Sequence, residues 1–579
     1  MHPLLVIARS EGSFDPKRRG NLIKKEFMQK VKEFILDKKN TKYFIFAALF
    51  ILYFWGLGAY GLLDHDEGRY SEIPREMLEK GDFITPTLNY LLYFEKPALH
   101  YWQTALSFKI FGLNEFGARF FPSLLGLFGV FFTWLFAKKL YDEDTANLTA
   151  VVLGTSILYY TIAHINITDM TVSFYLILSL FAFYFYFTEN KKIWAFVFYA
   201  AMALAVLTKG LIGIVLPGGV IFWFMIFTRR WDIIKKLLYW PGILLFFIIS
   251  VPWFYMVNKV NPGFFHFFFI QEHFLRYATK MHNRYEAWWF FIPVILGGLF
   301  PWVIGLFLSA KNIISKKHDA LFLMLWVVVM LIFFSISSSK LIPYIIPLFP
   351  PLLVIIARNI MDMIRQDSKP KYMALATFIT VMAAAMAVAA IIIFGGGVQL
   401  KRLDGIMLYK DVIYSLIALC VICAVAMWCF VKHKSYGLLI YSVFSFMFLL
   451  AAKPGFVTIS DERSTWRLMH SMREYVKPQD IIVSYSTYLQ DIPFYLQRRI
   501  IITGWIGELE YGYDKVSPEE RAKWMVADKD IHTLLERPLE PGQKMYFVVR
   551  DRYLDKYPFK ESTKLIDRAG KYSAYVRES

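Results

Sequence analysis

The chain has 579 residues, of which 57% are hydrophobic and 18% aromatic, and its mean hydropathy is +0.43. A soluble protein of this length would divide into several cores and would be less apolar, so the composition excludes an ordinary soluble protein. The formal net charge of +18 does not indicate a nucleic-acid partner, because much of the Lys and Arg falls in short loops between apolar runs.

Apolar runs of about 20 residues recur along the chain and predict a polytopic α-helical membrane protein. Residues 1–42 are basic and lack an early apolar segment, so we expect a cytoplasmic segment without a cleavable signal peptide. About thirteen spans are predicted after it: 43–63, 119–137, 146–163, 171–187, 194–208, 211–228, 238–257, 289–308, 319–336, 344–361, 373–394, 411–430 and 436–452. Cys420, Cys423 and Cys429 share one late run, which argues against a disulfide framework and a zinc site.

The loops divide this membrane domain, residues 43–453, into two sides. Every second short loop is rich in Lys and Arg, which places the N-terminus in the cytoplasm and the C-terminal region outside. Two long outer loops, 64–118 and 258–288, combine aromatic and charged residues and are expected to form helices that lie on the membrane. One such helix should end at Gly81. The cationic excess also suits contact with anionic membrane lipids.

From about residue 454 the composition changes, and residues 454–579 are predicted to form a small soluble α/β domain on the outer side. A helix is expected over 458–480. The segments "IIVSY", "RRIIITG", "KMYFVVR" and "SAYVRE" are typical of short strands. For residues 486–500 an ordinary structural role is the favoured interpretation, with docking onto the outer loops as the alternative.

The segment "DHDE", residues 64–67, places three acids and a histidine at the mouth of the first predicted span. A carboxylate held there can act as a general base or bind a cation. For the charges between Glu72 and Lys80, a solvated helix face is the favoured interpretation.

Further polar residues converge on the same predicted side. In "YFEKPALHYW" Lys96 follows Glu95 between aromatic residues, and a Lys in that position can hold a lipid phosphate. Asp169 stands at the start of an apolar span, where a helix N-cap is the commoner role. A charged side chain such as that of Lys209 is energetically costly at the end of an apolar span unless it is paired with an acid. Together with Lys340 and Tyr344 in "SSSKLIPY" and with His273 in "QEHFLRY", these residues indicate a site for an amphipathic, anionic substrate.

Residues 66–102, "DEGRYSEIPREMLEKGDFITPTLNYLLYFEKPALHYW", resemble the lipid-linked aminoarabinose transferases of bacteria, in the protein-mannosyltransferase-like branch of the GT-C glycosyltransferases. The resemblance runs from about residue 43 to 360. It continues through Asp169 and through the segments "TKG" (208–210), "FFHFFFIQEHFLRY", "PVILGGLFPW" (293–302) and "KLIPY" (340–344). The chain departs from the family pattern at Gly68, Pro74 and Ser338, the last of which stands where the family usually has a lysine.

The resemblance implies a GT-C membrane domain and transfer of a sugar from a polyprenyl phosphate donor, by inverting direct displacement, at the bacterial inner membrane. The favoured prediction for the sugar is 4-amino-4-deoxy-L-arabinose, and for the acceptor it is a phosphate of lipid A. By the same resemblance, Lys96, Arg69 and Tyr344 would hold the donor phosphate. Asp66 and Asp169 would face the acceptor or sugar, Asp66 being the preferred base, and Glu95 would orient Lys96 or contact the sugar. Lys209, His273, Tyr93 and Lys340 are the remaining substrate-binding candidates.

The sequence requires no cofactor, although a divalent metal could bridge Asp66 and His273. We expect a monomer. Three alternatives remain open: the same reaction with another sugar or with a protein or glycan acceptor, a transporter or flippase for a lipid-linked sugar, and a receptor-like assembly protein. A transporter would place its ionisable groups near the bilayer midplane, whereas here they cluster at the outer ends of the predicted spans.

Overall fold

The computed structural model describes residues 40–275, 286–308, 318–394 and 404–578. Residues 1–49 and 50–579 form separate units, and every contact described below lies within the second. The helix α2 (Thr41–Phe54) crosses this boundary and ends at Phe54, nine residues earlier than the predicted first span.

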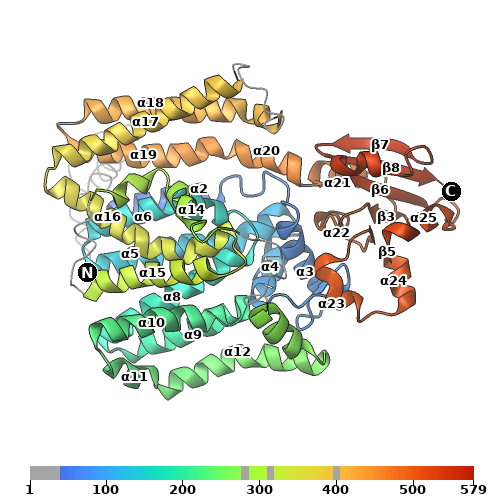
Figure 1. Cartoon of the computed structure of the whole chain (residues 1–579), viewed down its shortest axis with the longest axis horizontal. Helices are drawn as coiled ribbons and strands as arrows, with labels where there is room; N and C mark the ends of the chain where they lie inside the picture. Colours follow the sequence, from blue (N-terminus) through green and yellow to red (C-terminus); the bar gives the residue numbers. More distant parts are fainter. Residues whose placement is uncertain (1–39, 276–285, 309–317, 395–403, 579) are drawn as a thin grey trace, which may run out of the picture. The chain divides into compact units, whose positions relative to one another are not determined.

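The prediction of a polytopic helical membrane protein is confirmed (Figure 1). In the described ranges, nine helical segments are long and apolar enough to cross a membrane. They are α5 (Glu115–Leu140), α8 (Thr168–Glu189), α9 (Lys192–Lys209), α12 (Trp240–Val260), α15 (His318–Ile336), η4 with α16 (Ile342–Arg365), α17 (Lys369–Phe394), η5 with α18 (Met407–Cys429) and α19 with α20 (Lys434–Arg463). The pair α6 (Glu143–Gly154) and α7 (Ile157–Ala163), bent by 64°, is a tenth candidate, and α10 (Ile212–Thr228) is a shorter apolar helix. The predicted count of thirteen is not confirmed.

One predicted span is broken. Residues 289–308 form α14 (Phe291–Gly298) and the 3₁₀ helix η3 (Trp302–Leu306) instead of one helix. Pro301 lies between them, and a proline has no N–H to continue a helix.

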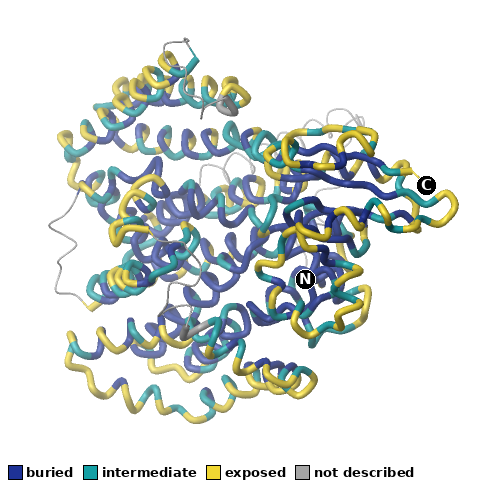
Figure 2. Tube along the Cα trace, turned by 45° about the vertical axis from the view of Figure 1, so that its right-hand side comes forward, coloured by how far each residue is buried: buried dark blue, intermediate teal, exposed yellow. Residues whose placement is uncertain are grey.

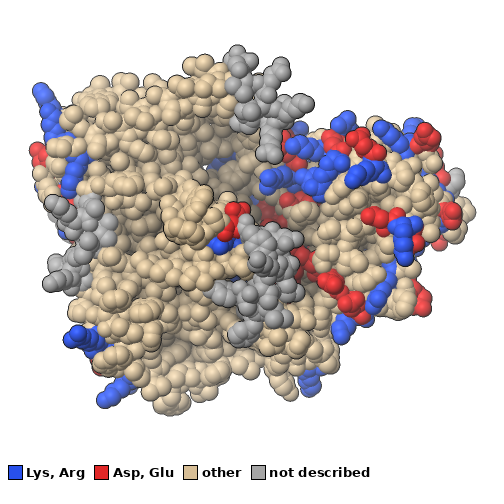
Figure 3. Space-filling model, in the orientation of Figure 1, with Lys and Arg blue, Asp and Glu red and all other residues tan. Residues whose placement is uncertain are grey.

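Burial differs strongly between the helices (Figure 2). The helix α8 is almost wholly buried among its neighbours, whereas α17 and α18 leave apolar side chains such as Ile391 and Ile422 exposed. Exposed apolar surface of this extent is typical of helices that contact lipid. Figure 3 agrees, because on the face shown the helices are largely free of charged side chains, which gather toward the two ends of the bundle.

The first long outer loop forms α3 (Asp66–Lys80), the hairpin β1 (Thr87–Leu88) and β2 (Leu91–Leu92), and α4 (Leu99–Phe111). As predicted, α3 ends at Gly81, which has a left-handed backbone with φ 67°. The solvated-face interpretation of 72–80 is wrong: Glu72 is buried, and the Arg75 guanidinium binds its carboxylate at 2.6 and 2.7 Å. Burial of a charged pair requires such a two-point contact.

The C-terminal sheet has six strands in the order β5-β4-β3-β6-β8-β7, and β3 to β6 are parallel while β7 and β8 are antiparallel (Figure 1). The four predicted strands are present as β3 (Ile481–Ser484), β4 (Ile501–Thr503), β6 (Lys544–Arg550) and β8 (Tyr572–Glu578). Two more, β5 (Met525–Val526) and β7 (Lys564–Ala569), were not predicted. The helix expected over 458–480 is also wrong: it divides into α20 (Pro454–Arg463) and α21 (Trp466–Met472), because Ser464 between them is extended.

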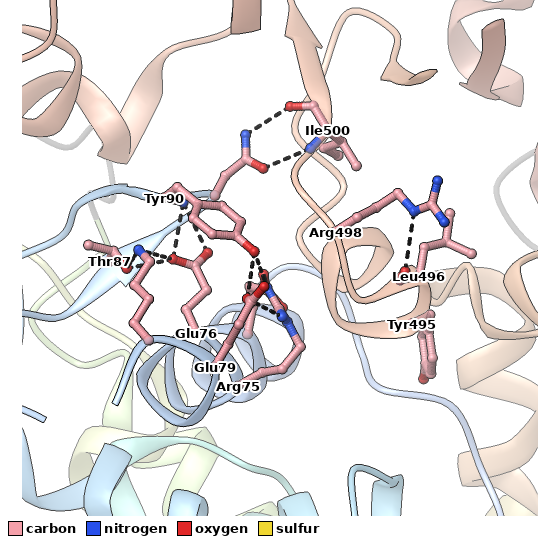
Figure 4. A network of polar contacts seen from close by, with 12 residues as sticks. Arg75, Glu76, Glu79, Thr87, Tyr90, Tyr495, Leu496, Arg498 and Ile500 are labelled. Carbon is pink, nitrogen blue, oxygen red and sulfur yellow. Dashed lines mark hydrogen bonds and ion pairs between the residues drawn. The ribbon is translucent and has the colours of Figure 1, made fainter. Parts of the chain in front are cut away.

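The segment 486–500 docks onto the first outer loop, so the alternative interpretation holds. Its helix α22 (Asp491–Leu496) packs against α3. At Gly68 a β-carbon would lie 2.5 Å from the backbone nitrogen of Asp491, so only glycine allows this approach. The side-chain amide of Asn89 exchanges two 3.0 Å hydrogen bonds with the backbone of Ile500, which faces the hairpin in Figure 4.

Candidate active site

A cavity of about 150 Å³, the inner cavity, lies where the ends of α8, α9 and α15 meet η4. Five of the residues that the sequence singled out line it: Glu95, Lys96, Asp169, Lys209 and Tyr344. Its remaining lining is largely apolar, with Phe333 and Phe334 from α15 and Pro343 and Pro347 from η4 among it. Two lysines, a tyrosine and three acids, the third being Glu272, therefore gather beside an apolar surface at the helix ends, as expected for an amphipathic substrate with a charged group.

Asp169 and Lys209 meet across this cavity. Asp169 is the second residue of α8 and Lys209 the last residue of α9, and Asp169 Oδ1 lies 2.6 Å from Lys209 Nζ. The Lys209 ammonium also lies 4.7 Å from the centre of the Tyr344 ring. The N-cap interpretation of Asp169 is wrong, because Ile167 occupies the N-cap position. The pair lets a lysine remain at an apolar span end.

Glu95 and Lys96 lie on the segment between β2 and α4. Lys96 Nζ donates a 2.9 Å hydrogen bond to the Glu95 carbonyl oxygen and lies 3.6 Å from the Glu95 carboxylate. Both side chains are largely buried yet line the inner cavity. A partly desolvated ammonium beside a cavity binds an anion more strongly than a fully hydrated one does.

A second and larger hollow, the outer pocket, has a volume of about 920 Å³ and shares Glu95 and Glu272 with the inner cavity. One wall comes from the π-helical segment η2 (His266–Leu275) and the other from residues 505–515 of the C-terminal domain. Five carboxylates line it: Glu95, Glu272, Glu508, Glu510 and Asp514. Sequence reasoning missed the contribution of 505–515, because no motif marks it.

Arg69 is placed differently from its predicted role at the donor phosphate. Its side chain is buried, and Nη2 lies 2.5 Å from Glu508 while Nε donates to Gln490 Oε1 at 3.0 Å. The third neighbour, Asp66, lies 3.5 Å from Nη1 with a side chain that is 64% exposed. Neither Arg69 nor Asp66 lines the inner cavity, so the preferred base of the sequence interpretation lies outside it.

The remaining candidates stand apart from the inner cavity. Tyr93 is buried beneath Arg69, whose guanidinium lies 5.8 Å from its ring centre. Lys340 donates to the backbone oxygens of Ser337 and Glu286, although Ser337 and Ser339 themselves line the cavity. The side chain of His273 lies outside the described residues, so the proposed metal bridge to Asp66 stays a prediction. Among the residues that are described, no three His, Cys, Asp or Glu side chains are grouped to hold a metal.

Glu67, the last acid of "DHDE", has a structural role with a partner that sequence reasoning missed. Its two carboxylate oxygens bind the Arg119 guanidinium at 2.8 Å each, and they also accept hydrogen bonds from the backbone nitrogens of Leu63 and Asn166. Glu67 and Arg119 are both fully buried. The pair ties α3 to α5, and so holds the outer loop over the helix bundle.

Comparisons with known proteins agree with this architecture. The family described as dolichyl-phosphate-mannose-protein mannosyltransferase matches residues 95–256. An undecaprenyl phosphate-alpha-4-amino-4-deoxy-L-arabinose arabinosyl transferase of Shewanella sediminis (strain HAW-EB3) is 28% identical over 82% of this chain and 89% of its own length. A protein of the same name from Enterobacter sp. (strain 638) is 34% identical, over 53% of this chain and 57% of its own.

The fold comparison covers nearly the whole chain. The crystal structure of ArnT from Cupriavidus metallidurans bound to undecaprenyl phosphate matches with a TM-score of 0.82 and 27% identity, over 94% of this chain and 99% of that one. The apo form of the same protein matches with a TM-score of 0.80. With its membrane helices, its outer loops and its C-terminal sheet, this chain is similar in sequence and in fold to the ArnT-like GT-C glycosyltransferases.

Proposed function

We propose that this chain transfers 4-amino-4-deoxy-L-arabinose from undecaprenyl phosphate to a phosphate of lipid A at the outer face of the bacterial inner membrane. The observation that carries the proposal is the inner cavity, where Lys96 and Lys209 face an apolar surface at the ends of membrane helices. The choice of sugar and lipid carrier follows the related proteins, which are named as aminoarabinose transferases that use undecaprenyl phosphate.

The residues present suit a direct displacement. The acceptor oxygen forms a bond to the anomeric carbon as the bond from that carbon to the lipid phosphate breaks, and the bonding electrons leave with the phosphate. Lys96 and Lys209 stabilise the charge that develops on the departing phosphate, and the Tyr344 ring keeps the Lys209 ammonium in place. Attack from the opposite side of the sugar inverts the anomeric configuration.

The acceptor decides whether a base is needed. A lipid A phosphate is already ionised and attacks without one. A hydroxyl acceptor must lose a proton, and Glu95 and Glu272, the two carboxylates that line both hollows, are placed to take it. The five carboxylates of the outer pocket favour a neutral or cationic group over a phosphate, so transfer to a hydroxyl acceptor is our second candidate function.

The charged groups argue against the transporter alternative. Asp169 and Lys209 stand at helix ends, whereas transporters place such groups at breaks near the midplane. We further propose that the N-terminus is cytoplasmic, that the C-terminal domain lies on the outer side and that the enzyme acts as a monomer, since the site is built from one chain.

The test is a transfer assay on purified protein in detergent, with undecaprenyl phosphate aminoarabinose as donor. Lipid A and dephosphorylated lipid A are offered as acceptors in parallel. Product on lipid A alone supports the first candidate, and product on the dephosphorylated lipid supports the second. Folded protein that forms no product with either acceptor overturns both.

A further inference from the structure

The side chain of Arg69 links the C-terminal domain to the candidate site. Arg69 belongs to α3, yet two of its three polar neighbours, Gln490 and Glu508, come from the other side of the domain junction. The side chain of Arg69 is buried, so these contacts fix its position rather than leave it in solvent. Burial raises the pKa of the Glu508 carboxyl, and the neighbouring Arg69 guanidinium opposes this shift.

The same part of the C-terminal domain grips the segment that carries Glu95 and Lys96. Phe94 packs on the ring of Tyr511 with centres 5.4 Å apart. At Gly512 a β-carbon would lie 2.5 Å from the backbone oxygen of Leu92, so the two backbones are in close contact there. Tyr511 and Gly512 therefore contact the segment 92–96 directly.

Arg69 makes a further contact with the same segment. Its guanidinium stacks against Tyr93, two residues before Glu95, at 5.8 Å from the ring centre. Tyr93 is fully buried and cannot move without displacing Arg69. A chain of direct contacts thus runs from Glu508 through Arg69 and Tyr93 to the backbone that carries Glu95 and Lys96.

We propose that Glu508 and Gln490 are positioning residues for sugar transfer: by holding Arg69, they make the docked C-terminal domain set the geometry of Lys96 and Glu95. The inference rests on the proposed function, because it assigns Lys96 to the donor phosphate. A misplacement of about 1 Å at a binding group can cost a large part of its effect, so loss of the grip should be measurable.

The experiment measures binding of undecaprenyl phosphate to the full-length protein, with undecaprenol as the lipid that lacks a phosphate. In Glu508→Gln we expect the Kd for undecaprenyl phosphate to rise about tenfold while that for undecaprenol is unchanged. The matched control is Glu519→Gln, which removes the same charge from an exposed position of the same domain that lines neither hollow. The control should bind like the wild type.

A second variant separates positioning from folding. If Glu508→Gln lowers the melting temperature, the conservative variant Glu508→Asp is measured, since it keeps a carboxylate partner for Arg69 and leaves the contact of Arg69 with Tyr93 in place. Recovery of both melting temperature and phosphate-dependent binding supports the proposal, and recovery of melting temperature alone overturns it. Wild-type-like binding by Glu508→Gln also overturns it. A wild type that binds both lipids equally refutes the donor assignment instead, and with it the proposed function.

Discussion

Asp169 and Lys209, 40 residues apart in the chain, form the ion pair that crosses the inner cavity, with Asp169 Oδ1 2.6 Å from Lys209 Nζ. Both side chains are largely buried, at 13% and 14% exposure. A lone ammonium at this depth would be costly, so the aspartate offsets that cost and holds Lys209 at the wall of the cavity. An arriving phosphate then meets a cation that is already in place.

This arrangement predicts opposite effects for the two partners. Lys209→Met removes a cation from the cavity and should weaken undecaprenyl phosphate binding about tenfold or more. Asp169→Asn keeps the cation and should bind the lipid phosphate at least as tightly as the wild type. The measurement is equilibrium binding to the purified protein. Lys192→Met, at the exposed opposite end of α9, is the control and should change nothing. Equal weakening by both cavity variants would contradict the account.

The buried pair of Glu67 and Arg119 should dominate the stability of the loop–bundle junction. Arg119→Met leaves the Glu67 carboxylate buried without its partner and should cost about 3–5 kcal/mol in the free energy of unfolding. The double variant Glu67→Gln with Arg119→Met should recover part of that loss, because it removes the buried charge. Thermal unfolding in detergent measures both. A melting temperature for Arg119→Met equal to that of the wild type would disprove a structural role for the pair.

Docking of the C-terminal domain should depend on Gly68, which has no β-carbon. Gly68→Ala would place a methyl group 2.5 Å from the Asp491 nitrogen and 2.6 Å from the Gln490 carbonyl carbon. Both are backbone atoms, so they can move away only at a cost in free energy. We expect a cost of about 1–3 kcal/mol and faster proteolysis at the domain junction. Gly455→Ala, where a β-carbon meets nothing within 4 Å, is the matched control. Identical proteolysis rates for the two variants would count against this docking geometry.

The same junction should respond to pH through Asp491. Burial, followed by the nearby Asp64 carboxylate, raises the pKa of Asp491 to about 7. The docked form therefore binds more protons than the undocked form between about pH 4 and pH 7. Docking should be strongest at the low end of that window and weaken as pH rises through it, levelling off above about pH 7.

Limited proteolysis between pH 5 and pH 8 measures this dependence. Asp491→Asn should flatten it, whereas Asp555→Asn, at an exposed position of the same domain, should leave it intact. A second titratable group at the junction is His65, whose ring nitrogen lies 2.9 Å from the Asp64 carboxylate, so His65→Gln is measured beside them. An Asp491→Asn profile that matches the wild type would show that another group controls docking.

Local patterns carried much of the fold prediction. Gly81 ends α3 as expected, and four strands of the C-terminal sheet follow directly from runs of β-branched and aromatic residues. The strand β7, with the sequence "KLIDRA", was missed because charges interrupt its apolar pattern. The break at Pro301 was missed because the apolar run continues through it.

The candidate site was predictable as a set of residues but not as a set of contacts. Five candidates meet at the inner cavity because the ends of α8 and α9, the helix η4 and the segment between β2 and α4 converge there. The contacts of Arg69 could not be predicted, because its partner Gln490 lies 421 residues away in the chain. Glu508 carried no signal at all, since a single glutamate in a soluble domain is ordinary.

The central claim is that Lys96 binds the donor phosphate during transfer. Its most direct test is the initial rate of aminoarabinose transfer by Lys96→Ala, beside the control Lys109→Ala on the exposed side of α4. We predict that Lys96→Ala loses at least a hundredfold in rate with an unchanged melting temperature, and that Lys109→Ala keeps wild-type activity. A folded Lys96→Ala protein that transfers the sugar at the wild-type rate would contradict the account.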